Sequence, residues 1–472
     1  MNGQVAVFLF YFLIVFGIGW LSLKRTKSEK DYWIAGGNLG WLLGGATLAA
    51  THTSAGSFMG TIGVMYSAGW GFGWLILAIP LAYWFMAAVL APRFTRVREL
   101  TLPAFMEARY YSKMVRGLAA AIILMATVVY IQAQIVAGGL IASTVFGIPT
   151  EVGMVGFTLI LLVYTAVGGM LAVVYTDFLQ IVIMTIGVLF ALPIAVRHVG
   201  GWGDLFDYVQ AVNPSTFTFE AFGPVLLFTM GLAFLLGSVS SPAQLVRLYA
   251  MKDMRAIRRG ILLAIVLITG INLVIFLLSL VSVVLFPALP TGDLAMPMLA
   301  RSVLPQLLGG VMLAAITSAM MSTVDSLLIV AGSALSQDIY RSLINPNAGE
   351  RQRIWIDRIG VIVVGTVPVL LLLSGVGEGE LIQFIVLLFT ALMASSFFVP
   401  VVAGVYWRRA TREGAAASMV GGISVALLWK LFGSDGVDPV LPGLLVSAGL
   451  MFVVSLMTPP PPAAAVEPYF PD

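Results

Sequence analysis

The chain has 472 residues, of which 60% are apolar and only 10% charged, with a mean hydropathy of +1.01. Soluble globular proteins carry about 25% charged residues, so this composition excludes a soluble enzyme or binding domain and indicates a protein embedded in lipid. The net charge of +3 arises from basic residues in short clusters between apolar runs, which argues against a nucleic-acid partner.

Apolar runs long enough to cross a bilayer recur along residues 1–457 and predict a single, all-α transmembrane domain. The first run has neither a basic segment before it nor a small-residue cleavage site after it, so it is predicted to be a span and not a signal peptide. We expect about thirteen transmembrane helices, at residues 5–23, 41–66, 69–91, 116–143, 152–167, 173–196, 224–246, 260–286, 308–335, 359–374, 381–406, 415–432 and 440–457.

Every second loop is basic, beginning with the cluster that follows the first helix. By the positive-inside rule, the N-terminus is expected outside and the C-terminus in the cytoplasm of a bacterial-type inner membrane. The proline-rich segment 458–472 has low complexity and is predicted to be a disordered cytoplasmic tail.

Two predicted helices contain interruptions at membrane depth. The second carries Thr51, His52, Thr53 and Ser54 in an apolar span, and the seventh carries Pro242 after a glycine and several serines. Irregular backbone inside a membrane is tolerated where it lines a cavity, and a pair of broken helices marks the binding site in transporters built from repeats.

The ninth predicted helix has an oxygen-rich face. Ala319, Ser322 and Thr323 follow the i, i+3, i+4 spacing of one helical face, and Ser326 continues it by one turn. Such hydroxyls often only bond their own helix or a neighbouring one. Together with carbonyls freed by a broken helix, they also form the oxygen set that an alkali cation prefers.

Two acidic residues lie inside predicted helices. An acid in a span costs about 2.5–3.5 kcal/mol on insertion scales, so Asp177 and Asp325 are candidates for function. The structural alternatives are that Asp177 caps its helix and that Asp325 is hydrogen-bonded to a neighbouring helix. For isolated amides and serines such as Gln134 and Ser395, interhelical packing is the more frequent role.

Five segments resemble the sodium:solute symporter family: DYWIAGGNLG (31–40), LPAFMEARY (102–110), YTAVGGMLAVVYTDFLQ (164–180), LVRLYAMKD (245–253) and MMSTVDSLL (320–328). The resemblance spans nearly the whole chain and implies the leucine-transporter fold. That fold has an extra N-terminal helix, two inverted five-helix repeats (here 41–196 and 224–406) and two C-terminal helices.

The resemblance also implies an ion site. The transported sodium ion is expected at the carbonyls of Ala50, Thr53 and Ala319 and the hydroxyls of Ser322 and Thr323. Some members of the family have a second site, which corresponds here to Asp177, Asp325 and Ser326. In those members a neutral serine stands at the position of Asp325, so a second ion and a shared proton are both open alternatives.

The solute is expected between the two broken helices, near Thr51, His52, Ser54, Gln134, Ser240, Ser241 and Ser395. The local sequence pattern is most similar to that of the pantothenate and monocarboxylate branch of the family, which favours a small carboxylate as the solute. Proline or another amino acid, and proton coupling on the same fold, are the alternatives. We expect a small solute and membrane lipid as partners, with no obligatory protein partner. No protease dyad, zinc cluster or channel filter is visible, so neither an enzyme nor a channel is expected.

Overall fold

A computed structural model describes residues 3–23, 33–377 and 379–470, apart from the side chains of residues 164 and 166–168. The predicted basic cluster at 24–30 lies outside the described residues. Within the described part, eleven helical segments are long and apolar enough to cross a membrane. The all-α membrane fold expected from the sequence is therefore confirmed.

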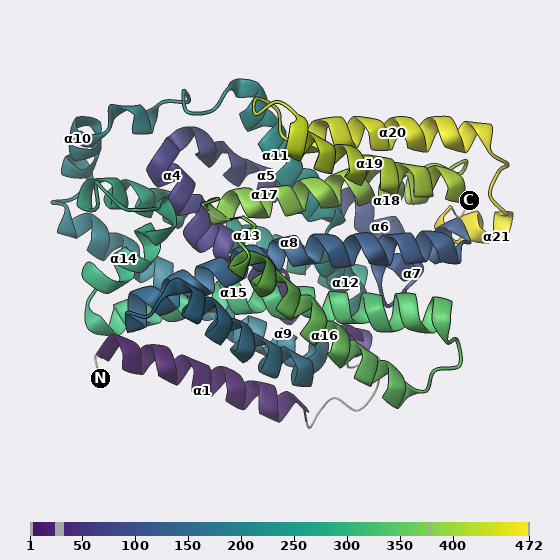
Figure 1. The fold of residues 1–472 in the computed structure, drawn as a ribbon, viewed down its shortest axis with the longest axis horizontal. Coiled ribbons are helices and arrows are strands. Elements are labelled where there is room, and N and C mark those ends of the chain that lie inside the picture. Colours follow the sequence, from purple (N-terminus) through teal and green to yellow (C-terminus); the bar gives the residue numbers. More distant parts are fainter. Residues whose placement is uncertain (1–2, 24–32, 378, 471–472) are drawn as a thin grey trace.

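The helices follow one another in a single bundle (Figure 1). The first half contains α1 (Gly3–Leu23), η1 (Ala35–Gly37), α3 (Trp41–His52), η2 (Gly56–Thr61), α4 (Ile62–Ala68), η3 (Trp70–Leu77), α5 (Ala78–Phe85), η4 (Met86–Leu90), α6 (Ala91–Phe94), α7 (Leu102–Tyr110), α8 (Lys113–Phe146), α9 (Thr150–His198), α10 (Trp202–Val212) and η5 (Pro214–Phe217).

The second half contains α11 (Pro224–Ser240), α12 (Pro242–Ala250), α13 (Met254–Leu285), η6 (Gly292–Leu294), α14 (Ala295–Ser302), α15 (Gln306–Ser333), η7 (Ala334–Ile344), α16 (Glu350–Leu373), α17 (Ile382–Met393), η8 (Ala394–Phe398), α18 (Val399–Tyr406), α19 (Arg412–Phe432), α20 (Val440–Met457), α21 (Ala463–Val466) and η9 (Glu467–Tyr469).

Two of the predicted spans do not appear among the eleven long segments. The predicted helix 41–66 is divided between α3, η2 and α4, because the chain leaves the helical conformation at Thr53. The predicted helix 152–167 corresponds to a shorter apolar helix, Thr150–Val163. It continues into the next span through a sharp bend at Gly169, whose positive φ of 66° suits glycine.

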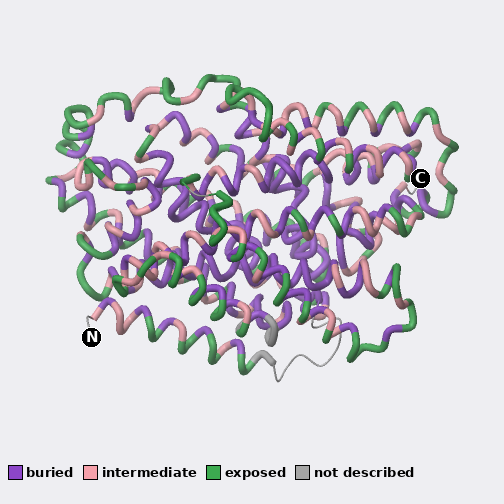
Figure 2. The backbone as a smooth tube through the Cα atoms, viewed as in Figure 1, coloured by how far each residue is buried: buried purple, intermediate pink, exposed green. Residues whose placement is uncertain are grey.

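The most buried span is the one formed by α15 and η7, which packs against α1, α8, α9 and α16. Helix α1 lies along one edge of the bundle, and α19 and α20 lie along the opposite edge (Figure 1). Buried residues fill the middle of the bundle, and exposed residues follow the outer helices (Figure 2). The centre of the bundle is therefore where a protected site would form.

The two ends of the bundle differ. We call the end that carries α7 and α21 the basic end, because Arg93, Arg109 and Arg408 all contact residues there. Helices α10 and α14 lie at the other end, and the N and C labels mark opposite ends of the molecule (Figure 1).

The prediction of a disordered tail is wrong for residues 459–470. The tail packs on α7, where Tyr469 is 1% exposed and its ring meets that of Phe105 at 5.6 Å. The guanidinium groups of Arg408 and Arg93 lie 5.4 and 5.7 Å from the ring of Phe470. Two aromatic residues, Tyr469 and Phe470, therefore anchor a segment whose composition is rich in proline.

Asp293 ties the loop after α13 to the beginning of α17. Its side chain is 2% exposed and accepts a hydrogen bond of 3.0 Å from the Ile382 amide. Burial, only partly offset by this hydrogen bond, raises the pKa of Asp293 from 3.8 to about 7. The folded state therefore holds a proton that the unfolded chain releases between those two values.

We expect lower pH to stabilise the folded state through Asp293. The contribution of Asp293 to stability is complete below its unfolded pKa and is lost as pH rises through about 7. Melting temperatures measured between pH 8 and pH 5 will show a smaller gain for Asp293→Asn than for wild type. The exposed acid Asp435 provides the control, since Asp435→Asn is expected to keep the wild-type slope. An unchanged slope in Asp293→Asn would contradict the assignment.

Candidate functional site

The first broken helix exposes backbone groups in the middle of the bundle. Helix α3 ends at His52, and Thr53 is extended, with φ −76° and ψ 102°. The Ser54 hydroxyl accepts a hydrogen bond from the Gly56 amide at 3.1 Å. The Ala55 amide donates to the side-chain oxygen of Gln134 on α8 at 3.0 Å. These bonds satisfy amides at the break, while the last carbonyls of α3 have lost their helical partners.

The second broken helix lies between α11 and α12. Ser241 is extended, with φ −65° and ψ 123°, and Pro242 opens α12. Proline has no amide hydrogen, so it is well suited to the first position after an interruption. Both interruptions that the sequence indicates are present.

The carbonyls at the end of α3 meet the hydroxyls of α15. Ser322 donates to the Ala50 carbonyl at 2.9 Å, and Thr323 donates to the Thr51 carbonyl at 3.2 Å. The same two hydroxyls lie 3.2 and 3.0 Å from the Ala319 carbonyl. Both side chains are 0% exposed, so this oxygen cluster is sealed from solvent.

The oxygen cluster fits a hard monovalent cation. Three carbonyls and two hydroxyls converge without a full negative charge among them, whereas divalent ions usually require carboxylate ligands. In the part of the chain that the structure describes, no group of three or more His, Cys, Asp or Glu residues is placed to hold a metal. Four of the five predicted sodium ligands lie together, namely Ala50, Ala319, Ser322 and Thr323.

The predicted ligand atom of Thr53 is its backbone carbonyl, and Thr53 directly follows the last residue of α3. Thr323 bonds the carbonyl of Thr51, and Thr53 lies beyond the helix end, with its buried hydroxyl lacking a partner. The sequence predicts a break within Thr51 to Ser54, and α3 ends inside that run, at His52. Thr51 is therefore the additional oxygen donor in this geometry.

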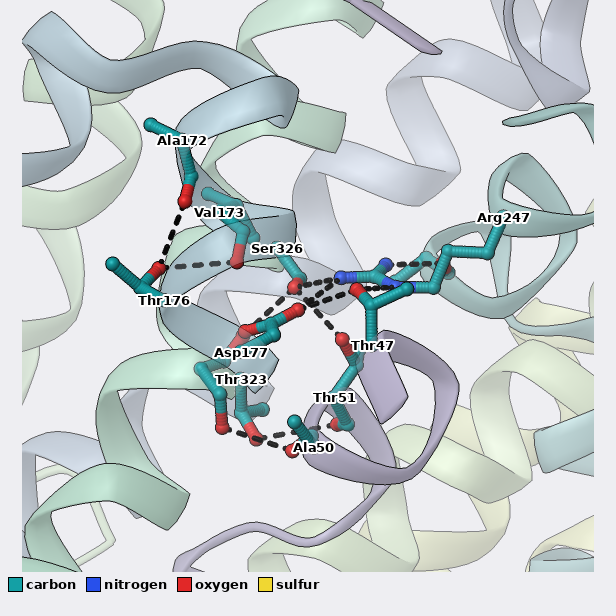
Figure 3. Close-up of polar contacts among 12 residues, drawn as sticks. Thr47, Ala50, Thr51, Ala172, Val173, Thr176, Asp177, Arg247, Thr323 and Ser326 are labelled. Atoms are coloured by element: carbon teal, nitrogen blue, oxygen red, sulfur yellow. Dashed lines mark hydrogen bonds and ion pairs between the residues drawn. The ribbon is translucent and has the colours of Figure 1, made fainter. Parts of the chain in front are cut away.

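Beside the oxygen cluster lies a buried ion pair that the sequence analysis missed. The guanidinium of Arg247, on α12, lies 3.2 Å from the Asp177 carboxylate, and both side chains are 0% exposed. Figure 3 shows the guanidinium reaching between Asp177, Ser326 and Thr47. The predicted helix stopped at residue 246, so this arginine was not counted as lying within a span. The available signal in the sequence for this ion pair was an arginine directly after an apolar run.

The two intramembrane acids have separate partners. Asp177 accepts a hydrogen bond of 2.5 Å from the Thr47 hydroxyl, and Asp325 accepts one from the Thr165 hydroxyl. Ser326 bonds Arg247 at 2.5 Å and Thr51 at 3.0 Å. The geometry therefore offers no direct support for a proton shared between the two carboxylates.

A small cavity of about 30 Å³ adjoins the oxygen cluster. It lies between the two broken helices and is lined from α3, α8, α11, α12, α15 and α17 by Thr51, His52, Tyr130, Phe234, Gly237, Ser238, Ser241, Ala243, Gln244, Thr323, Leu327, Val386, Phe389 and Thr390. The His52 ring packs edge-on against Tyr83 and Phe234, and its Nε2 atom has no partner. Of the predicted solute residues, Thr51, His52 and Ser241 line this cavity.

The other four predicted solute residues lie outside the cavity. Ser54 and Gln134 bond the backbone at the first break. Ser240 bonds the Leu236 carbonyl of its own helix. Ser395 lies against Gly422 and Gly443, on the side of α19 and α20. The pattern of polar residues did not reveal which way each helix is rotated.

Comparison with known proteins explains this arrangement. Residues 32–422 match the profile described as the sodium:solute symporter family, SSF. The chain belongs to the sodium:solute symporter family. This sodium:solute symporter is therefore a sodium-coupled membrane transporter and not an enzyme, and the resemblance seen in the sequence is confirmed.

Several named relatives match the symporter along nearly its whole length. The osmoregulated proline transporter OpuE of Bacillus subtilis is 30% identical over 96% of this chain and 95% of its own. The high-affinity proline transporter PutP of the same organism is 27% identical over 95% and 97%. The sodium/pantothenate symporter of Escherichia coli is 29% identical over 94% of each chain.

Solved structures share the fold of the symporter. A Na⁺-coupled sialic acid symporter in a substrate-bound, outward-open state aligns with a TM-score of 0.83 and 20% identity, over 98% of this chain and 99% of that one. MHP1, a nucleobase-cation-symport-1 family transporter in a closed conformation, aligns with a TM-score of 0.57 and 14% identity, over 94% and 100%. These likenesses support the leucine-transporter-like fold.

Proposed function

We propose that this symporter binds its sodium ion at the oxygen cluster and carries a small carboxylate-bearing solute at the adjoining cavity, which must widen to hold it because about 30 Å³ accommodates little more than a water molecule. One observation carries the proposal: Thr51 and Thr323 belong to both places. Thr323 bonds the Thr51 carbonyl in the oxygen cluster, and both residues line the cavity. An ion that fixes these two residues also shapes the cavity wall, which couples the two affinities.

The lining of the cavity supports a solute whose charge is met mainly by hydroxyls and the ion. No Asp, Glu, Lys or Arg is among its lining residues, and hydroxyls and the amide of Gln244 lie among the rings of His52, Tyr130, Phe234 and Phe389. Arg247 is occupied by its own partners and does not line the cavity. A carboxylate can receive hydrogen bonds from the hydroxyls and lie beside the bound cation.

The named relatives carry proline or pantothenate, which both bear a carboxylate. A zwitterion such as proline has no net charge, so a single sodium ion can use both its chemical gradient and the membrane potential, worth about 2.3 kcal/mol per 100 mV. An anion such as pantothenate would cancel the electrical part when moved with one ion. A net-neutral carboxylate solute is therefore compatible with a single ion site, whereas an anion favours a second ion.

We propose that the basic end faces the cytoplasm. Positive residues favour the cytoplasmic side, and the two labelled ends of the chain lie at opposite ends of the bundle (Figure 1). On this basis the chain crosses thirteen times, counting the broken α3–α4 segment and Thr150–Val163 together with the eleven long segments.

Uptake into liposomes tests the function. With the purified symporter, we expect an inward sodium gradient, and not a potassium gradient, to drive accumulation of proline, pantothenate or another small carboxylate. Prolinamide and pantothenol, which lack the carboxylate, serve as matched controls and are expected not to compete. Accumulation driven by a pH gradient in the absence of sodium would contradict the proposal and favour proton coupling. Competition by the two controls would contradict a carboxylate solute.

A further inference from the structure

Arg247 has an unusually complete set of hydrogen bonds for a charged side chain inside a span. Its Nε donates to the Thr47 hydroxyl at 2.9 Å, and its Nη1 donates to the Ala243 carbonyl at 2.6 Å. Its Nη2 lies between the Asp177 carboxylate at 3.2 Å and the Ser326 hydroxyl at 2.5 Å. A buried guanidinium is tolerated when its donors and its charge are satisfied in this way.

The partners of Arg247 come from three other helices. Thr47 belongs to α3, Asp177 to α9 and Ser326 to α15, while Arg247 itself follows the break between α11 and α12. Thr47 also donates to Asp177 at 2.5 Å, which closes a ring of contacts (Figure 3). The guanidinium therefore joins both broken helices to α9 and α15.

This cluster is connected directly to the oxygen cluster. Ser326, which accepts from Arg247, donates at 2.7 Å to the carbonyl of Ser322. Ser326 also lies 3.0 Å from the Thr51 hydroxyl. Ser326 alone thus separates Arg247 from residues of the ion site, through two successive hydrogen bonds, and a movement of the guanidinium would displace Ser326.

The cluster lies toward the basic end. Asp177 is two turns along α9 from the bend at Gly169, and beyond Asp177 α9 runs on to His198 and to α10 at the other end (Figure 1). Val173 lies one turn closer to the bend on the same face as Asp177, and it is 2% exposed. The buried pair of Arg247 and Asp177 therefore lies among packed side chains between the ion site and the basic end.

We propose that Arg247 is the positioning residue of a gate on the basic side of the ion site, and that its contacts with Asp177 and Ser326 must open before the ion leaves in that direction. The inference rests on the proposed sodium symport. While the gate is closed, separating the pair would leave two uncompensated buried charges, which is strongly unfavourable. Water that enters as the helices separate can solvate both charges, so the open state tolerates the separation.

The accessibility of a single introduced cysteine measures whether this gate is open. The chain contains no cysteine, so Val173→Cys supplies one thiol without background. In vesicles with the basic end accessible, we measure its alkylation rate by a membrane-impermeant maleimide in sodium. We expect slow labelling in the otherwise wild-type chain. Labelling should be about tenfold faster in Arg247→Gln and in Asp177→Asn, the change that corresponds to shifting the equilibrium by roughly 1.4 kcal/mol.

Additional variants separate a gate from a purely structural role. If Arg247 acts through Asp177, the double variant Arg247→Gln/Asp177→Asn should label no faster than either single variant. This pair also contains no uncompensated charge, so it keeps the test available if a single variant fails to fold. Arg247→Lys retains the charge without the planar fork, and we expect an intermediate rate.

The matched control uses a second ion pair at the basic end, in which the acid is also buried. Arg116 lies 2.7 Å from Asp338, which is 0% exposed, and neither residue touches the ion site. Arg116→Gln is expected to leave labelling at Val173→Cys unchanged.

The outcomes distinguish this proposal from the proposed function. Sodium-dependent thermal stabilisation of the wild type is measured in parallel, and its absence would overturn the sodium site first. If that stabilisation is present but the folded Arg247→Gln chain labels at the wild-type rate, the gate is wrong while sodium binding stands. Equal acceleration by Arg116→Gln, or loss of folding in all the Arg247 variants including Arg247→Lys and the double variant, would show a general packing role and overturn the gate as well.

Discussion

Replacing Ser322 with alanine is expected to abolish most of the sodium-selective rise in the melting temperature of the purified symporter. The Ser322 hydroxyl lies 2.9 Å from the Ala50 carbonyl and 3.2 Å from the Ala319 carbonyl, at the centre of the oxygen cluster. Hydrogen bonds to charged groups are worth roughly 1.5–3 kcal/mol, and an oxygen ligand to an ion is at least comparable. We therefore expect sodium affinity to fall by about 10- to 150-fold.

The measurement is a sodium titration against potassium at equal ionic strength. A ligand that binds only the folded state stabilises it by mass action, by about 2.7 kcal/mol at 100 times the dissociation constant. Ser333→Ala is the matched control, because Ser333 is on the same helix and bonds the Val330 carbonyl of that helix at 2.8 Å. A wild-type titration curve for Ser322→Ala would remove the oxygen cluster as the sodium site.

The second large effect is expected from Gln134→Leu. Gln134 is 0% exposed, and its side-chain oxygen accepts a hydrogen bond from the Ala55 amide at 3.0 Å, at the interruption that follows α3. Leucine has a similar volume but leaves this buried amide without a partner, which costs about 1–3 kcal/mol. Because the interruption presents the Ala50 and Thr51 carbonyls, we expect sodium affinity to fall by about 5- to 150-fold.

Solute and sodium titrations distinguish this role from the solute contact predicted from the sequence. If Gln134 supports the break, the sodium midpoint shifts and solute affinity at saturating sodium changes little. If it binds solute, the reverse pattern appears. Gln132→Leu, two residues away on α8 and also buried, controls for the loss of a glutamine and is expected to leave the sodium midpoint in place.

Local patterns in the sequence predicted the elements of the ion site well. The spacing of Ala319, Ser322 and Thr323 placed them on one face of a helix, because helical geometry depends only on residues a few positions apart. Polar residues from Thr51 to Ser54 indicated a break, because such a run is unfavourable in a continuous lipid-facing helix. The meeting of the two elements was an implication of the family resemblance, and the structure places them within hydrogen-bonding distance.

Properties that depend on distant helices were less accessible. Ser240 and Ser395 point away from the cavity because neighbouring helices determine how each helix is rotated about its axis. Arg247 was missed because its partners lie 79, 70 and 200 positions away in the chain. The ordered tail was missed because low-complexity composition outweighed two aromatic residues near its end. In each case the deciding contact is tertiary.

The buried pair of Asp177 and Arg247 also has a consequence for how the protein is made. The two residues are 70 positions apart, so the ribosome delivers the acid to the membrane before its partner. An acid in a span costs about 2.5–3.5 kcal/mol on insertion scales, and the Thr47 hydroxyl is the hydrogen-bond donor already synthesised. The helices up to α9 are therefore inserted before α12 supplies the guanidinium that pairs with Asp177 in the folded protein. A residue of α12 thus completes the environment of an acid inserted earlier, so the pair links membrane assembly to the same contact that we propose as a gate.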